Sequence, residues 1–309
     1  MTVHIAGSIN LDIITSLERL PSPGETVLAL ATARLPGGKG ANQAVAAARM
    51  GALTRMIGAV GEGDGGRWMI ERLAAEGIDV SGIAVLEGCD TGTAYIAVDA
   101  QGENQIIVVS GANARLSAVA PVTEGVLLSQ LEVPVAALLP VFAQSRAIRM
   151  LNTAPAVADA RCLFDHVDIL VLNEHELAVY TGGAGDNGIR ERARSLLTRE
   201  DQAVVVTLGA EGALAVRKDW HLHVPAVPVV PVDTIGAGDC FCGALAALLD
   251  EGCCLSEALP KASAAAALST LGQGAAPSMP TRHAVEDLLS GAATEHAPPI
   301  KTPPAAALS

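Results

Sequence analysis

Ile169-Leu170-Val171-Leu172-Asn173-Glu174-His175-Glu176 joins a short apolar strand to a polar helix start, and this stretch decides the fold. Four consecutive apolar residues between polar ones are typical of a strand buried on both faces. From about residue 117 onward, similar short apolar segments alternate with helical segments, and they cover residues 125–131, 149–152 and 203–208. This alternation predicts an α/β fold, a doubly wound and mainly parallel sheet with helices on both faces.

The amino-terminal third adds further elements to this pattern. We expect strands over residues 3–9 and 54–60, helices over residues 41–50 and 67–76, and exposed strands within residues 26–34. Two more strands, residues 94–98 and 104–109, read as a hairpin joined through Asp99-Ala100-Gln101-Gly102. Residues 1–290 are therefore predicted to form a single α/β domain. Residues 291–309 are rich in proline and alanine, and we expect a mobile tail there.

Composition limits the classes of function. Half of the 309 residues are hydrophobic but only 2% are aromatic, which suits buried parallel strands covered by alanine-rich helices. The formal charge of −13 argues against a nucleic-acid binder. The six cysteines show no metal-binding spacing and read as reduced thiols. Neither a signal peptide nor an apolar stretch long enough to cross a bilayer is recognisable, so we expect a cytoplasmic protein without membrane contact.

Asp233-Thr234-Ile235-Gly236-Ala237-Gly238-Asp239 carries the first chemical signal. Small residues precede an Ala/Leu-rich helix, whose first turn presents free N–H groups and a positive dipole end to an anion. Asp239 lies in that turn, where a carboxylate could take a proton from a substrate hydroxyl. An ordinary glycine-rich helix start is the structural alternative.

Two further candidates follow strands. Asn173 and Glu176 lie at the carboxyl end of a strand, where ligands of open sheets bind, and together they suit a hydrated Mg²⁺ beside phosphates. A helix cap with a solvated glutamate is the alternative. Thr207-Leu208-Gly209-Ala210-Glu211-Gly212 has glycines that would let a nucleotide approach, although it could equally be a tight turn.

Two glycine-rich segments resemble other phosphate motifs. Gly37-Gly38-Lys39-Gly40-Ala41-Asn42 is not a P-loop, because glycine rather than serine or threonine follows the lysine, but it can place Lys39 and Asn42 against sugar hydroxyls. Gly61-Glu62-Gly63-Asp64-Gly65-Gly66 matches the dinucleotide fingerprint formally. Its two acidic side chains disfavour a pyrophosphate, so an NAD-dependent oxidoreductase is the weaker interpretation.

Taken in this order, the segments resemble the ribokinase-type sugar kinases, the family that includes the B-type phosphofructokinases. The resemblance runs from about residue 3 to residue 288, and its two signatures lie at residues 37–64 and 233–239. Smaller pieces point within the family to an enzyme for the 5-hydroxyl of D-ribose: Asn10-Leu11-Asp12, Pro23-Gly24-Glu25-Thr26, Gly102-Glu103-Asn104, Gly111-Ala112-Asn113, Gln130-Leu131-Glu132 and Asn152-Thr153-Ala154-Pro155-Ala156.

The resemblance implies a role for each matching residue. Asp239 would be the catalytic base, and the backbone of Gly236, Ala237 and Gly238 would form an anion hole. The remaining implied residues fall into three groups. The sugar would contact Asn10, Asp12, Gly38, Lys39, Asn42, Glu132 and Asp239; ATP and Mg²⁺ would contact Asn173, Glu176, Thr207, Gly209, Gly212 and Ser263; a monovalent cation, K⁺, would contact Asp233, Ile235, Ser269, Gly272, Gly274 and Ser278.

The resemblance also implies a small β-sheet lid, formed from about residues 10–36 and 91–110. This lid would cover the sugar and form a homodimer interface. Ile235, Cys240-Phe241-Cys242 and Ser263 depart from the family pattern, and Cys240 next to the base raises the hypothesis of sensitivity to thiol oxidation. Within the class, a kinase for deoxyribose, fructose or a nucleoside is the alternative, and a non-catalytic sugar or nucleotide sensor is the alternative from another class.

Overall fold

The computed structural model describes residues 1–117, 119–183 and 188–291. Apart from Gly291, the predicted tail lies outside the described residues. In the described ranges, no helix is both long and apolar enough to cross a membrane.

A nine-stranded sheet forms the body of the protein, in the order β13-β12-β11-β10-β9-β8-β1-β4-β5. Neighbours from β11 through to β5 are parallel, and β12 runs antiparallel to both β11 and β13. The predicted doubly wound, mainly parallel sheet is therefore confirmed. The strands are β1 (Val3–Ala6), β4 (Thr54–Gly61), β5 (Asp79–Leu86), β8 (Val126–Ser129), β9 (Ile148–Asn152), β10 (Ile169–Asn173), β11 (Ala203–Thr207), β12 (Ala213–Val216) and β13 (His221–Val224).

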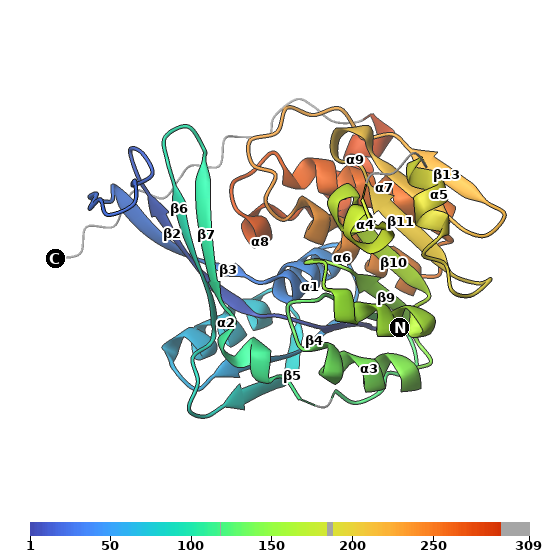
Figure 1. Ribbon diagram of the computed structural model, residues 1–309, viewed down its shortest axis with the longest axis horizontal. Helices are drawn as coiled ribbons and strands as arrows, with labels where there is room; N and C mark the ends of the chain where they lie inside the picture. The colour runs from blue at the N-terminus through green and yellow to red at the C-terminus, as the bar shows by residue number, and fades with distance from the viewer. Residues whose placement is uncertain (118, 184–187, 292–309) are drawn as a thin grey trace.

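Helices cover both faces of this sheet (Figure 1). Strand β10 shows why, because Ile169 and Val171 enter one hydrophobic cluster while Leu170 and Leu172 enter the other. The α-helices are α1 (Lys39–Arg49), α2 (Asp64–Ala75), α3 (Val135–Gln144), α4 (Glu174–Thr181), α5 (Ile189–Arg194), α6 (Ala237–Asp250), α7 (Leu255–Ser269), α8 (Ala275–Ser278) and α9 (Arg282–Ser290), and short 3-10 helices cover Gly111–Arg115, Ala158–His166 and Gly209–Glu211.

Helix α6 is central to the face that it covers, since every residue from Asp239 to Asp250 is buried. It packs on α1 through Gly243, where an added Cβ would fall only 2.4 Å from the carbonyl oxygen of Gln43. A side chain at this position would push the two helices apart. The close approach fixes the start of α6 relative to the first turn of α1.

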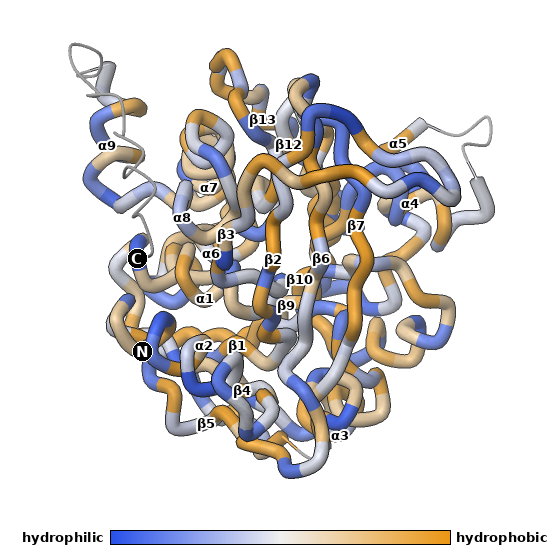
Figure 2. The backbone as a smooth tube through the Cα atoms, turned by 90° about the vertical axis from the view of Figure 1, so that its left-hand side faces the viewer, coloured by the Kyte–Doolittle hydropathy of each residue, from blue (hydrophilic) through white to orange (hydrophobic). Residues whose placement is uncertain are grey.

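A second sheet of four strands, in the order β3-β2-β6-β7, extends away from the body (Figures 1 and 2). Its strands are β2 (Asn10–Ser16), β3 (Ala31–Gly37), β6 (Gly92–Val98) and β7 (Asn104–Val109). They match the predicted lid ranges to within one residue, and the predicted hairpin is confirmed. The expectation of strand over residues 26–34 is wrong for 26–30, which form no regular structure. Strand β5 was not predicted. It lies at the edge of the sheet, where none of its residues is fully buried, and its sequence does not alternate between apolar and polar residues.

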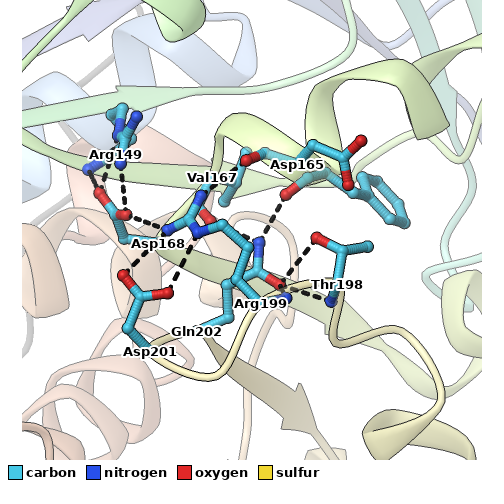
Figure 3. A network of polar contacts seen from close by, with 9 residues as sticks. Arg149, Asp165, Val167, Asp168, Thr198, Arg199, Asp201 and Gln202 are labelled. Atoms are coloured by element: carbon cyan, nitrogen blue, oxygen red, sulfur yellow. Dashed lines mark hydrogen bonds and ion pairs between the residues drawn. The ribbon is translucent and has the colours of Figure 1, made fainter.

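An ion-pair network joins the amino ends of β9, β10 and β11 (Figure 3). Asp168 accepts hydrogen bonds from Arg149 Nε at 2.9 Å and from Arg199 Nη2 at 2.6 Å. Below it, the buried Gln202 amide donates to the carbonyls of Phe164 and Val167, at 2.5 and 2.6 Å. Burial alone would raise the pKa of Asp168, but the hydrogen bonds from the two arginines outweigh burial and hold it below its usual value.

We expect Asp168→Asn to lower the free energy of unfolding at pH 7 by about 2 kcal/mol, because it removes charge-assisted hydrogen bonds at a half-buried site. A lowered carboxyl pKa contributes stability above the unfolded-state pKa, and that stability is lost as the pH falls through the folded-state pKa. Urea denaturation should therefore show the gap between variant and wild type shrinking toward pH 3. Asp201→Asn, at an exposed carboxylate that also pairs with Arg199, is the control and should change stability by less than about 0.5 kcal/mol.

Candidate active site

Helix α6 begins at a glycine turn that brings the Asp233–Asp239 signature to the carboxyl ends of the parallel strands. Gly236 adopts a left-handed φ of 81°, and a Cβ there would lie 2.5 Å from the Cβ of Ala275. Both geometry and space therefore require glycine. Gly238 in the first turn has nothing within 4 Å of its Cβ position, so this side of the turn is open.

The Asp239 carboxylate is buried and held from α1. Its Oδ2 accepts a hydrogen bond from Asn42 Nδ2 at 3.0 Å, and its Oδ1 accepts one from Gln43 Nε2 at 3.0 Å. Burial raises the pKa of Asp239, while Lys39 and the two amides act in the opposite direction and only partly offset it. A buried carboxylate with a raised pKa, facing a cavity, has the properties of a general base.

Lys39 begins α1, and its side chain lines the same cavity as Asp239 and Glu176. The negative charges of Asp239, Glu132 and Glu176 raise the pKa of Lys39 although burial opposes them. The ammonium group is therefore a fixed positive charge among carboxylates, at a position suited to a negatively charged substrate group.

Glu132 fixes the turn into α1. Its Oε2 accepts hydrogen bonds from Ser8 Oγ at 2.6 Å and from the Lys39 amide at 3.1 Å. Gly38 before this amide has a φ of 87°. The predicted sugar residues Gly38, Lys39 and Glu132 are thus brought together by the structure, and one oxygen of Glu132 already serves the turn.

Asn10 and Asp12 come to this region from β2, a strand of the small sheet. Asn10 Oδ1 accepts from Asn113 Nδ2 at 2.7 Å, and Asn113 also binds both backbone groups of Ile9. Asp12 Oδ1 is buried without a hydrogen-bond partner. Burial, reinforced by repulsion from Glu132 and Asp239, raises the pKa of Asp12 to about 7. A buried carboxylate oxygen without a partner is suited to accept hydrogen bonds from a polyhydroxyl ligand.

Asn173 and Glu176 form a capping box at the start of α4. The backbone N–H of Glu176 donates to Asn173 Oδ1 at 2.8 Å, and the backbone N–H of Asn173 donates to Glu176 Oε2 at 2.9 Å. The helix cap of the alternative interpretation is therefore present, but its solvated glutamate is not, because Glu176 is buried. Asn173 and Glu176 both line the cavity that holds Lys39 and Asp239. Burial raises the pKa of Glu176.

This cavity, of about 210 Å³, adjoins a larger and mainly apolar one of about 510 Å³. Thr207 and Gly238 line both cavities, so the two cavities lie side by side at these residues. Gly209 and Ser263 line the larger cavity, and the Ser263 hydroxyl is buried without a partner. Gly212 is not among the lining residues, because its φ of 98° turns the chain against Val224, whose carbonyl oxygen lies 2.0 Å from the Cβ position.

The residues predicted to hold a monovalent cation lie before α6, at the end of α7 and in the segment 272–278, and Asp233 joins the first of these to the third. Its carboxylate accepts hydrogen bonds from the amides of Ile235 and Gly274, both at 2.9 Å. Ser278 Oγ donates to the Gly274 carbonyl at 2.6 Å, and Gly272 approaches Ser278 closely. The Ser269 hydroxyl instead donates to Ala266 within its own helix. Among the described residues, no group of three or more His, Cys, Asp or Glu side chains could hold a metal ion.

Two glycines of the turn that matched the dinucleotide fingerprint, Gly61 and Gly66, pack closely against backbone. A Cβ on Gly61 would lie 2.3 Å from the Cys89 carbonyl oxygen, and one on Gly66 would lie 2.0 Å from the carbonyl oxygen of Gly61. Gly61 therefore serves close packing against the segment before β6, and Gly66 serves the packing of α2 on β4, whereas the position of a Cβ on Gly63 is open.

Several polar residues of the site were given no role from the sequence, although Asn113, Gln130 and Asn152 belong to the pieces quoted for the resemblance: Ser8, Gln43, Asn113, Gln130 and Asn152. Gln43 stands on the buried face of an alanine-rich helix, where a polar side chain needs a partner. Gln130 and Asn152 directly follow or end apolar strands, and this placement is the signal that could have found them.

The geometry of the site indicates the class of protein. A buried carboxylate at a helix start, a lysine beside it, and two connected cavities at one edge of an α/β sheet fit a phosphoryl-transfer enzyme. The sequence profile described as pfkB family carbohydrate kinase matches residues 2–282. The chain therefore belongs to the pfkB family of carbohydrate kinases, and it is a phosphotransferase with an alcohol group as acceptor.

Individual relatives agree with this assignment. The chain is 36% identical over 298 residues to a protein of Bacillus subtilis named ribokinase, covering 93% of this chain and 99% of that one. It is 34% identical to a protein of Salmonella typhi named deoxyribokinase, covering 94% and 99%. A solved structure of Arabidopsis thaliana ribokinase complexed with ribose and ATP superposes with a TM-score of 0.83, at 31% identity and with 93% and 98% coverage.

The hypothesis of an oxidisable Cys240 meets a physical obstacle in the structure. Cys240 is only 1% exposed, and burial raises its pKa to about 12. Oxidants attack the thiolate, which such a group does not form near neutral pH.

We expect Cys240 and Cys242 to stay unmodified when the folded protein is treated with iodoacetamide, whereas the exposed Cys162 and Cys254 are alkylated. Peptide mass spectrometry before and after unfolding in urea measures this difference. Rapid alkylation of Cys240 in the folded protein would restore the oxidation hypothesis.

Proposed function

We propose that this protein transfers the γ-phosphate of ATP to the 5-hydroxyl of D-ribose. The observation that carries the proposal is the Asp239 carboxylate, buried at the start of α6 beside Lys39 in a cavity that connects, at Thr207 and Gly238, with a larger apolar one. The similarity to ribokinases, one of them solved with ribose and ATP, supports the choice of both substrates.

In this proposal the two cavities divide the substrates. The apolar cavity takes the adenine against small side chains, with the Ser263 hydroxyl available to its edge. The triphosphate passes Thr207 and Gly238 toward Asp239. Ribose lies over Asn42 and the Gly38–Lys39 turn, with Asn10 and Asp12 above it and Glu132 beside it.

The reaction needs positioning and charge neutralisation more than covalent chemistry. Asp239 takes the proton of the ribose 5-hydroxyl as that oxygen forms its bond to the γ-phosphorus. The bond between the γ-phosphorus and the bridging oxygen breaks, and ADP leaves with its electron pair. The N–H groups of the turn at Gly236–Gly238, together with Lys39, stabilise the charge that develops on the phosphoryl oxygens.

Two cations complete the proposed site. The carboxylate of Glu176 and the amide of Asn173 suit a hydrated Mg²⁺ that is held mainly by phosphates and water, and bound Mg²⁺ would neutralise phosphate charge. The loops joined by Asp233 suit K⁺, which would be held by carbonyls near Ile235, Gly272 and Gly274. Bound K⁺ would add positive charge behind the helix start.

The small sheet supports two further parts of the proposal. As a lid it would exclude water from the sugar and limit wasteful hydrolysis of ATP. Strand β7 is exposed along its whole length, and Ile106, Ile107, Val108 and Val109 are each about half exposed or more. An exposed apolar edge strand favours pairing with a second copy, so we expect a homodimer formed through this sheet. The six free thiols favour a reducing, cytoplasmic location.

Coupled ADP release over a panel of ribose, deoxyribose, fructose and nucleosides, each with and without K⁺, tests the function. We expect ribose to give the highest kcat/KM, Mg²⁺ to be required and K⁺ to activate. The deoxyribokinase relative makes deoxyribose the second candidate.

Asp239→Asn should keep ribose binding while turnover falls by about 100-fold or more. Ribose binding without ADP release by the wild type would identify a sensor, and near-normal turnover in Asp239→Asn would remove the base.

The buried Asp12 carboxyl predicts a pH dependence of sugar binding. Its pKa of about 7 in the free protein lies above the usual value, so it is protonated at low pH and ionised at high pH. Sugar hydroxyls bind the ionised form through charge-assisted hydrogen bonds, and ribose affinity should therefore rise as the pH increases through about 7.

Calorimetric titration of ribose between pH 5.5 and pH 8.5 measures this effect. Asp12→Asn should bind ribose at least about 10-fold more weakly at pH 8 and should lose the step near pH 7. Glu103→Gln, on the exposed β6–β7 turn, is the control and should keep the step. An unchanged step in Asp12→Asn would assign the titration to another group.

A further inference from the structure

Gln43 is fully buried on α1 and does not line either cavity of the site, yet its side chain contacts the proposed base directly. We infer that Gln43 is a positioning residue, which keeps an N–H donor on Asp239 Oδ1 and thereby sets both the orientation and the basicity of that carboxylate. This inference rests on the proposed role of Asp239 as the base. It extends that role to a side chain that the substrates do not reach.

The direction of the Gln43 amide is fixed by a group that can only accept hydrogen bonds. Asn152 Nδ2 donates to the Val171 carbonyl at 3.3 Å, so Asn152 Oδ1 faces Gln43 as an acceptor. Gln43 Nε2 donates to this oxygen at 3.1 Å and to Asp239 Oδ1 at 3.0 Å. Because the backbone carbonyl cannot donate, reversing the chain of amides would set acceptors against each other.

The other end of the Gln43 amide also has a partner. Gln43 Oε1 accepts a hydrogen bond from Gln130 Nε2 at 2.5 Å. The Gln130 side chain fits only because residue 7 is glycine, whose Cβ position lies 2.0 Å from Gln130 Oε1. Asn152 on β9 and the Val171 carbonyl on β10 thus determine which atom of Gln43 meets Asp239, and Gln130 contacts the atom that remains.

Helix packing fixes the distance between Gln43 and the base. Gly243 on α6 lies against the Gln43 carbonyl, one turn beyond Asp239 on the same helix. The backbones of α1 and α6 therefore cannot separate or slide without breaking this contact. The hydrogen bond from Gln43 is consequently part of a rigid unit, whereas Asn42, the other donor, is also a proposed sugar contact.

The charges around Asp239 show why an added donor matters. Lys39 from α1 is the positive group facing the carboxylate, while Asp12 from β2, Glu132 and Glu176 from α4 are negative groups on the other sides. Cys240 and Cys242 from α6 are buried thiols with raised pKa values, and they add no charge. Burial and the negative groups favour the protonated form of Asp239, and the amide donors oppose them.

The pH profile of kcat tests the inference, with ribose and MgATP saturating. Gln43→Met removes the donor at similar size, so the acidic limb of the profile should move up by about 1 pH unit or more. At a pH on that limb, kcat should therefore fall by about 10-fold or more. Gln43→Glu keeps the shape but places a second carboxyl against Asp239. It should move the limb further, because two adjacent carboxyls share one proton.

Controls separate positioning from general damage. Gln202→Met removes an equally buried glutamine at the other end of the sheet and should leave the limb in place, even if the protein unfolds at a lower temperature. Ribose affinity, measured without ATP, should stay within about threefold in Gln43→Met, since the residue does not line the cavity.

The results divide clearly. An acidic limb at its wild-type position in folded Gln43→Met and Gln43→Glu would overturn the inference. A loss of kcat that is matched by an equal loss of ribose affinity would do so too. Asp239→Asn, measured in the same series, distinguishes this failure from failure of the proposed function. Normal turnover in Asp239→Asn removes the base itself, whereas an inactive Asp239→Asn with unshifted Gln43 variants removes only the positioning role.

Discussion

The contact between α1 and the start of α6 is the constraint on which the site depends. A carboxylate inside an alanine-rich core is costly unless donors meet it, and the donors for Asp239 come from the neighbouring helix, at Asn42 and Gln43. They reach it because Gly243 lets the two helices touch. The same contact aligns Lys39, at the beginning of α1, with the glycine turn of α6. The charged centre of the site is therefore a product of helix packing.

The sheet supplies the rest of the geometry. Parallel strands end at one edge, and the polar residues at the ends of β9, β10 and β11 line the cavities together with the starts of α1, α4 and α6. At the opposite, amino ends of the strands, the network around Asp168 and Gln202 ties β9, β10 and β11 together (Figure 3). Stability and chemistry thus occupy opposite ends of the same strands, and this separation lets the site keep poorly partnered groups such as Asp12 and Ser263.

Much of this could be predicted from the sequence. The short apolar runs predict the strands because burial on both faces leaves no room for polar residues, and the glycine signatures predict the helix starts. The edge strand β5 escaped prediction since one exposed face and an exposed edge weaken the apolar pattern. The network of Gln43, Gln130 and Asn152 escaped for a different reason. Its three members come from distant parts of the chain, and only the assembled sheet shows that their amides form one directed series.

The small sheet and the body meet in a way that bears on how any ligand is held. Asn10 and Asp12 belong to β2, whereas Lys39 and Asn42 belong to α1, and Gly38 alone connects β3 to α1. A molecule that binds residues of both β2 and α1 would link the small sheet to the body of the protein. Its apparent affinity then combines its own contacts with the free energy of holding those parts together. If a sugar binds as proposed, two sugars that differ by one hydroxyl would differ both in how tightly they bind and in how long they hold the small sheet and α1 together.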